Sequence, residues 1–142
     1  MDIRNITPEF SAAPQLDPQD MPAIAAAGFQ AVICNRPDAE VPPSHQAATL
    51  RAAAEAAGLS FHELPLTHQT FTPEAIAKYR AILDQTPGRV LAYCASGTRS
   101  TIGWALGQAG EMDTDDILAA ARNGGYDLSN IRPALEAAAH KG

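Results

Sequence analysis

The sequence has few cysteines, few basic residues and no long apolar run. Its two cysteines, Cys34 and Cys94, are too few for a disulfide scaffold, and no cluster has metal-ligand spacing, so we expect no metal and no other cofactor. Ten Lys and Arg against 16 Asp and Glu give a net charge of −6, which argues against a nucleic-acid partner. No apolar segment suits a signal peptide or a membrane span of roughly 18 residues. We therefore expect a cytoplasmic protein with reduced thiols and no membrane partner.

Apolar runs alternate with helix-like stretches along most of the chain. The pattern predicts short strands over 3–7, 10–16, 29–34, 60–66 and 89–94. It predicts helices over 17–27, 44–57, 72–85, 100–108 and 114–122, and a last helix capped by Ser129. Such alternation indicates an α/β fold with a mostly parallel sheet flanked by helices on both faces, and we expect residues 1–142 to form a single domain. Ligands bind such sheets at the carboxyl ends of the strands.

One predicted strand ends in a cysteine, in Val90-Leu91-Ala92-Tyr93-Cys94. A loop of small residues, Arg99 and a predicted helix follow. Backbone N–H groups at a helix N-terminus bind anions and favour a thiolate over a thiol, and an arginine fork suits an oxyanion. We therefore expect Cys94 to be a nucleophile, Arg99 to hold an anionic substrate, and an anion-binding loop to be formed by Ala95, Ser96, Gly97, Thr98 and Ser100. A lone cysteine at a strand end is usually packing alone, but Cys-x-x-Gly-x-Arg-Ser between strand and helix is far more specific.

The spacing within this loop resembles that of one enzyme class, and the rest of the chain resembles another. Four residues separate Cys94 from Arg99, as in the active loop of rhodanese-type sulfurtransferases. Tyrosine and dual-specificity phosphatases use five, usually with histidine before the cysteine, where Tyr93 stands here. However, the stretch Phe29-Gln30-Ala31-Val32-Ile33-Cys34-Asn35-Arg36-Pro37-Asp38 is similar to a phosphatase strand and its Asn-Leu-Arg-like turn, and three predicted helices follow the loop.

This combination resembles one family over nearly the whole chain. It is the small bacterial phosphatase-like domain of the beta-lactamase-hydrolase-like (DUF442) type, found beside or fused to persulfide dioxygenases of the metallo-β-lactamase fold. Ile6-Thr7-Pro8-Glu9-Phe10-Ser11 and Gln15-Leu16 also fit that family. The resemblance implies a cysteine-phosphatase-like fold carrying a rhodanese-like loop, a small anionic substrate (thiosulfate, a persulfide or a phosphate ester), and a functional link to a persulfide dioxygenase.

The two chemistries differ in their need for a proton. Hydrolysis of a phosphate ester needs a general acid, which the phosphatases supply from a loop after the preceding strand. Here that segment, Leu66-Thr67-His68-Gln69-Thr70-Phe71, has no carboxylate, and His68 is more simply explained as a solvated loop residue than as the acid. Sulfur transfer needs no acid, because sulfite or a thiolate of low pKa leaves unaided. We therefore favour a sulfurtransferase that forms a Cys94 persulfide. The alternatives are a cysteine-dependent phosphatase and a non-enzymatic module that senses anions or persulfides.

A few other residues have two interpretations each. Ser100 is expected either to hydrogen-bond the Cys94 sulfur or to serve as a helix cap. Cys34 is expected to pack in the core rather than to resolve an oxidised Cys94. Arg36 and Asp38 are expected to form a surface turn rather than to brace the site. Trp104, on the helix behind the loop, is expected to be core.

Overall fold

Five strands form a mostly parallel sheet in the computed structural model, which describes residues 1–67 and 69–141. The strands lie in the order β1-β2-β5-β3-β4, with β1 at Arg4–Asn5, β2 at Phe10–Ala13, β3 at Phe29–Cys34, β4 at Ser60–Glu63 and β5 at Arg89–Tyr93. Only β1 is antiparallel, paired with β2. β3 and β5 are interior strands, and their continuous apolar sequence is typical of parallel strands covered on both faces.

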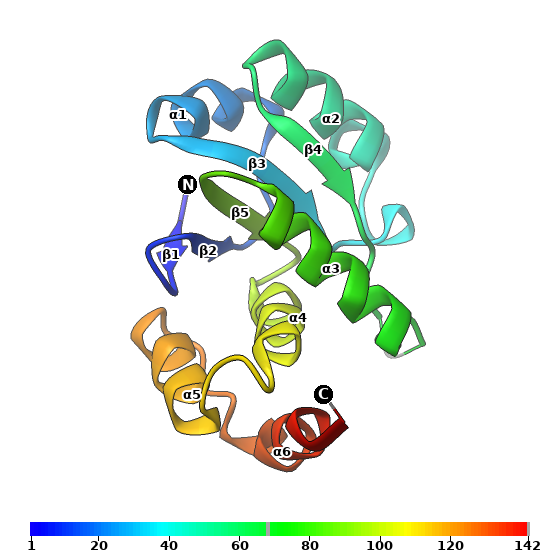
Figure 1. Cartoon of the computed structure of the whole chain (residues 1–142). Coiled ribbons are helices and arrows are strands. Elements are labelled where there is room, and N and C mark those ends of the chain that lie inside the picture. Colours follow the sequence, from blue (N-terminus) through cyan, green and yellow to red (C-terminus); the bar gives the residue numbers. More distant parts are fainter. Residues whose placement is uncertain (68, 142) are drawn as a thin grey trace.

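Helices cover both faces of this sheet, as Figure 1 shows. α1 (Met21–Ala26) and α2 (Ala47–Ala56) pack on one face, and α3 (Pro73–Gln85) and α4 (Thr98–Gln108) on the other. α5 (Thr114–Asn123) and α6 (Arg132–Lys141) lie against α4, farther from the sheet. Short 3₁₀ helices occupy Pro18–Asp20, Asp38–Glu40, Pro43–His45 and Ser129–Ile131. The α/β fold with helices on both faces, predicted from the alternation, is confirmed.

Two clusters of buried side chains, one on each face, hold these layers together. The cluster beneath α1 and α2 includes Leu50 and Leu91, and the other is built around Trp104. Trp104 stacks on Phe10 with ring centroids 5.6 Å apart and planes 10° apart, so it is core as predicted. Tyr79 of α3 is buried in the same cluster, and its hydroxyl donates to the Ser100 carbonyl at 2.8 Å. This bond joins α3 to the first turn of α4.

Several element boundaries differ from the predicted ones. α2 begins at Ala47 rather than Ser44, because a 3₁₀ turn comes first and the Asp38 carboxylate accepts from the Ala47 N–H at 2.8 Å. α4 begins at Thr98, two residues early, because Gly97 adopts the left-handed conformation (φ +97°) that turns the chain directly into the helix. The predicted cap of α3 is confirmed, since Thr72 accepts from the Ala75 N–H.

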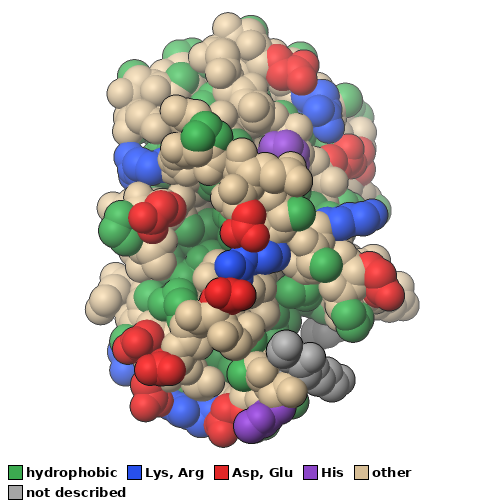
Figure 2. Space-filling view, viewed as in Figure 1, with side chains coloured by type: hydrophobic (Ala, Val, Ile, Leu, Met, Phe, Trp, Pro, Cys, Tyr) green, Lys and Arg blue, Asp and Glu red, His purple; other side chains and the backbone are tan. Residues whose placement is uncertain are grey.

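Charged side chains of both signs are interspersed on the face shown in Figure 2. There the basic side chains lie mostly singly and next to acidic ones rather than in a stripe. Elsewhere in the chain, Arg80 pairs with Asp84 and Arg51 with Glu55, each within one helix. Within residues 1–67 and 69–141, no helix is both long and apolar enough to cross a membrane.

Candidate active site

The Cys94 loop leaves the carboxyl end of β5, between the ends of β2 and β3. Cys94 is 1% exposed, and its N–H donates to the Ala13 carbonyl at 3.4 Å. The Gln15 N–H donates in turn to the Ala95 carbonyl at 3.3 Å. These two bonds extend the pairing of β2 with β5 into the loop, so the sheet fixes where the thiol stands.

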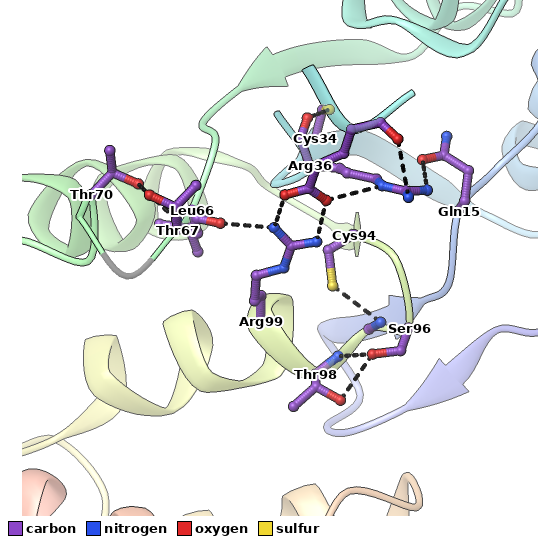
Figure 3. A network of polar contacts seen from close by, with 12 residues as sticks. Gln15, Cys34, Arg36, Leu66, Thr67, Thr70, Cys94, Ser96, Thr98 and Arg99 are labelled. Atoms are coloured by element: carbon purple, nitrogen blue, oxygen red, sulfur yellow. Dashed lines mark hydrogen bonds and ion pairs between the residues drawn. The ribbon is translucent and has the colours of Figure 1, made fainter. Parts of the chain in front are cut away.

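A backbone donor points at the sulfur. The Gly97 N–H donates to Cys94 Sγ at 3.1 Å, a contact that the left-handed backbone of Gly97 makes possible (Figure 3). The Gly97 carbonyl accepts from both the N–H and the hydroxyl of Thr101, which ties the loop to the first turn of α4. The strand, loop and helix expected around the cysteine are therefore present, with the sulfur at the N-terminus of α4.

The hydroxyl side chains of the loop bond within the loop instead of to the sulfur. Ser96 Oγ lies 3.0 Å from Thr98 Oγ1 and accepts from the Thr98 N–H at 3.4 Å. Both residues are exposed, as is Ala95. Ser100 is fully buried, and its Oγ has no hydrogen-bond partner among the described residues. The bond from Ser100 to the Cys94 sulfur, one of two expectations for that residue, is not formed.

Arg99 is held rigidly by an acid from another part of the chain. Its Nη1 donates to Glu40 Oε2 at 2.8 Å and its Nη2 to Glu40 Oε1 at 2.7 Å, and Nη1 also donates to the Leu66 carbonyl at 3.1 Å. These bonds use the end of the guanidinium. The side edge, made by Nε–H and the second Nη2 proton, is turned toward Cys94 in Figure 3. That edge has the spacing that binds two oxygens of an oxyanion.

Arg36 braces the same acid. Its Nε donates to Glu40 Oε1 at 3.2 Å, its Nη2 to the Glu40 carbonyl, and its Nη1 to Gln15 Oε1 at 3.2 Å (Figure 3). Arg36 is therefore more than a surface turn, the interpretation that the sequence favoured. Asp38 instead accepts from the N-terminus of α2 and has a structural role.

The Arg99–Glu40 pair perturbs both ionisations. The hydrogen bond from Arg99, followed by that from Arg36, lowers the pKa of Glu40 from 4.5 against the opposing effect of burial. The same bond raises the pKa of Arg99, and the nearby Cys94 sulfur raises it further. Glu40 is therefore an anion at neutral pH, and it is an orienting group for Arg99 rather than a proton donor.

Replacing Glu40 by glutamine is expected to lower stability at neutral pH but not in acid. Because the folded state lowers the pKa of Glu40, its contribution is complete above about pH 4.5 and is lost as the pH falls through the folded value. The side chain is 35% exposed, so solvent screening keeps the difference small. Melting temperatures of the wild type and Glu40→Gln should therefore converge as the pH falls below the lowered pKa of Glu40. Glu63→Gln, at an exposed position at the end of β4, is the control, and an equal pH-dependent difference there would contradict this assignment.

The segment after β4 contributes a carbonyl to the site but no carboxylate. Leu66 bonds Arg99, and the Thr67 N–H and Thr70 hydroxyl close a tight turn at 2.7 Å. His68, the candidate acid in this segment, lies outside the described residues. Cys34 is buried beside Tyr93 beneath α2, and burial raises the pKa of its thiol, as expected of a packing residue. No group of three or more potential metal ligands occurs among the described residues.

Sequence reasoning missed two distant side chains that bond Arg99 and the loop. Glu40 lies 59 positions before Arg99, and Tyr126 donates its hydroxyl to the Ser96 carbonyl at 3.0 Å from 30 positions away. No local motif marks either of them.

Comparisons with known proteins add a family and a fold. Residues 2–111 match the family model described as beta-lactamase hydrolase-like protein, phosphatase-like domain. A beta-lactamase hydrolase-like protein of Agrobacterium fabrum is 32% identical over 111 residues, which are 77% of this chain and 26% of that protein. The chain thus spans about a quarter of that relative's length.

Two solved structures superpose over nearly the whole chain. One, described as a candidate phosphatase from Neisseria meningitidis, has a TM-score of 0.84 and 34% identity over 97% of this chain and 99% of that one. The other, Tk-PTP in its active form, has a TM-score of 0.74 and 15% identity over 99% of this chain and 97% of that one, a likeness of fold alone. These matches confirm the cysteine-phosphatase-like fold.

Proposed function

The chain belongs to the family of the phosphatase-like domain of beta-lactamase hydrolase-like proteins. From the geometry of its site, we propose that this member is a sulfurtransferase acting through a persulfide of Cys94. The observation that carries the proposal is the bonding of the Glu40 carboxylate, which accepts from Arg99 with both oxygens and from Arg36 with one. This carboxylate stands at the site, but two arginines hold it as an anion, so it has no proton to give. Such a site suits a leaving group that departs without a proton, as sulfite does.

The proposed reaction has two steps. The Cys94 thiolate attacks the outer sulfur of thiosulfate, the donor S–S bond breaks, and its electron pair leaves with sulfite. An acceptor thiolate, or cyanide, then attacks the outer sulfur of the persulfide and regenerates the thiolate. The edge of Arg99 that faces Cys94 in Figure 3 is suited to the sulfite oxygens, and the Gly97 N–H, 3.1 Å from Sγ, to the anionic sulfur.

A hollow beside Arg99 gives room for a donor larger than thiosulfate. It has a volume of about 440 Å³ and is lined by Glu40, Thr67, Phe71, Arg99 and Ile102. Ligand pockets of this size bury small organic groups. The non-reacting part of an organic persulfide or thiosulfonate fits here, with the apolar Phe71 and Ile102 in contact with it.

Phosphoryl transfer is the second candidate, and the comparisons favour it over sulfur transfer. The family description names a phosphatase-like domain, and the Neisseria structure is described as a candidate phosphatase. In this case the Cys94 sulfur attacks phosphorus, the ester P–O bond breaks, and the alcohol leaves. Water then attacks the phosphorus of the cysteinyl-phosphate, which releases inorganic phosphate and regenerates Cys94. With Glu40 ionised, esters with acidic leaving groups, such as aryl phosphates, are expected to react best.

Intact-mass measurement with two substrates separates these candidates. We expect incubation with thiosulfate to add one sulfur atom at Cys94, and cyanide to remove it as thiocyanate. Release of phosphate from an aryl phosphate without any sulfur gain would reject sulfur transfer in favour of the phosphatase. Tight oxyanion binding with no turnover of either substrate would leave the anion-sensing module. The cytoplasmic location and the link to a persulfide dioxygenase stay predictions.

A further inference from the structure

One peptide group of the loop, between Ser96 and Gly97, has both of its polar atoms bound. Its N–H donates to Cys94 Sγ at 3.1 Å, and its carbonyl accepts the Tyr126 hydroxyl at 3.0 Å. A hydrogen-bonded chain therefore runs from a phenol, across one planar peptide, to the sulfur. Because the peptide is rigid, a bond that fixes the carbonyl also fixes the direction of the N–H. Hydrogen bonds in such a chain also polarise one another.

The end of α5 places Tyr126 over the loop. Gly125 adopts the left-handed conformation (φ +95°), and the Tyr126 N–H returns to the Ala121 carbonyl at 3.0 Å. The Gly124 carbonyl accepts from Arg4 Nη1, which ties this turn to β1. The half-buried tyrosine therefore approaches the loop from an anchored segment.

Gly97 leaves the space that the tyrosine hydroxyl fills. A Cβ at position 97 would collide with the Tyr126 hydroxyl and would also need a backbone conformation that side chains disfavour. The hydroxyl is thus packed against the loop backbone as well as bonded to it. This close fit leaves the 96–97 peptide little room to rotate.

We propose that Tyr126 is a positioning residue that acts through the Ser96–Gly97 peptide to keep the Gly97 N–H directed at the Cys94 sulfur. The proposal rests on Cys94 being the nucleophile of the proposed function. Without the hydroxyl the carbonyl loses its donor, and rotation of the peptide plane presents an oxygen to the sulfur in place of the N–H. Carbonyl oxygen repels an anionic sulfur, whereas N–H stabilises it. Tyr126 lies beyond the family-matched residues 2–111, so the site extends into the carboxyl-terminal helices.

Tyr126→Phe removes the hydroxyl and keeps the ring, which makes it the direct test. We expect the pH at which iodoacetamide alkylates Cys94 at half its maximal rate to rise, and the kcat for sulfur uptake to fall about tenfold. The matched control is Tyr93→Phe. The Tyr93 hydroxyl is buried in the cluster under α1 and α2, on the side of Cys34. Thermal unfolding of both variants verifies that each is folded.

Two results would overturn the proposal. An unchanged alkylation profile in Tyr126→Phe would show that the hydroxyl does not act on the sulfur. An equal shift in Tyr93→Phe would show a general loosening of the core. Alkylation needs no substrate, so this test does not depend on the reaction that the protein catalyses. If the wild type took up no sulfur but Tyr126→Phe still shifted the alkylation profile, the proposed function would be rejected and the positioning role of Tyr126 would be supported.

Discussion

Replacing Cys94 by serine is expected to abolish sulfur uptake and to lower turnover at least about a thousandfold. A serine hydroxyl is a far weaker nucleophile than a thiolate near neutral pH, and it forms no persulfide. The fold should survive, because serine is smaller than cysteine and its oxygen can accept the Gly97 N–H that now bonds the sulfur. Intact mass after thiosulfate treatment, thiocyanate release and circular dichroism together measure this outcome.

Cys34→Ala is the matched control for that experiment. Cys34 is buried in the cluster under α2, its sulfur lies 3.4 Å from the Arg36 carbonyl, and burial raises the pKa of its thiol. The Cys34→Ala variant should therefore still gain one sulfur atom at Cys94 after thiosulfate treatment. A serine variant at position 94 that still gained sulfur would contradict the assignment of the nucleophile. Loss of the gain in Cys34→Ala would show that both thiols take part.

Replacing Arg99 by lysine is expected to lower kcat/KM for thiosulfate by about a hundredfold to a thousandfold. Lysine keeps the positive charge but offers a single ammonium in place of a planar fork. It has no second edge with which to bind Glu40 and an oxyanion at the same time, whereas Arg99 bonds both Glu40 oxygens and the Leu66 carbonyl with one end. Steady-state kinetics with thiosulfate measure the change.

Arg122→Lys provides the comparison, because Arg122 is exposed on α5 and its side chain makes no hydrogen bond or ion pair with the loop among the described residues. It should leave kcat/KM at the wild-type value. If Arg99→Lys also kept wild-type kinetics, positive charge alone would suffice, and the bidentate role of the fork would be rejected. Cys94 alkylation in Arg99→Lys separates a loss of substrate binding from damage to the nucleophile.

The sequence predicted well the features that depend on a few consecutive residues. Continuous apolar runs defined β3 and β5, and Thr72 with the following proline defined the start of α3. The loop from Cys94 to Ser100 was recognisable because the spacing of its cysteine, glycine and arginine and its position between a strand and a helix both indicate an anion-binding loop. The family resemblance carried by these segments is confirmed by the match over residues 2–111.

The features that it did not predict depend on residues far apart in the chain. Nothing near Glu40 shows that Arg99 lies against it, and nothing near Tyr126 shows that its hydroxyl reaches Ser96. Ser100 illustrates the opposite error, since its place after the arginine suggested a bond to sulfur, yet its buried hydroxyl has no partner among the described residues. The spacing of residues in the sequence predicts which of them lie close together on one helix or strand. The direction of a side chain such as Ser100, however, depends on how all the elements pack against one another.

The long reach of these contacts has a consequence for how the protein acquires its activity during folding. The loop is bonded by Ala13 and Gln15 near the start of the chain, its arginine by Glu40 and Leu66, and its Ser96 carbonyl by Tyr126 near the end. Closing such long intervals costs chain entropy before any contact stabilises it, so contacts of this kind form late. A partly folded chain with only β5, the loop and α4 in place would lack these supporting hydrogen bonds. Full reactivity of the Cys94 thiol is therefore expected only once the tertiary structure is complete.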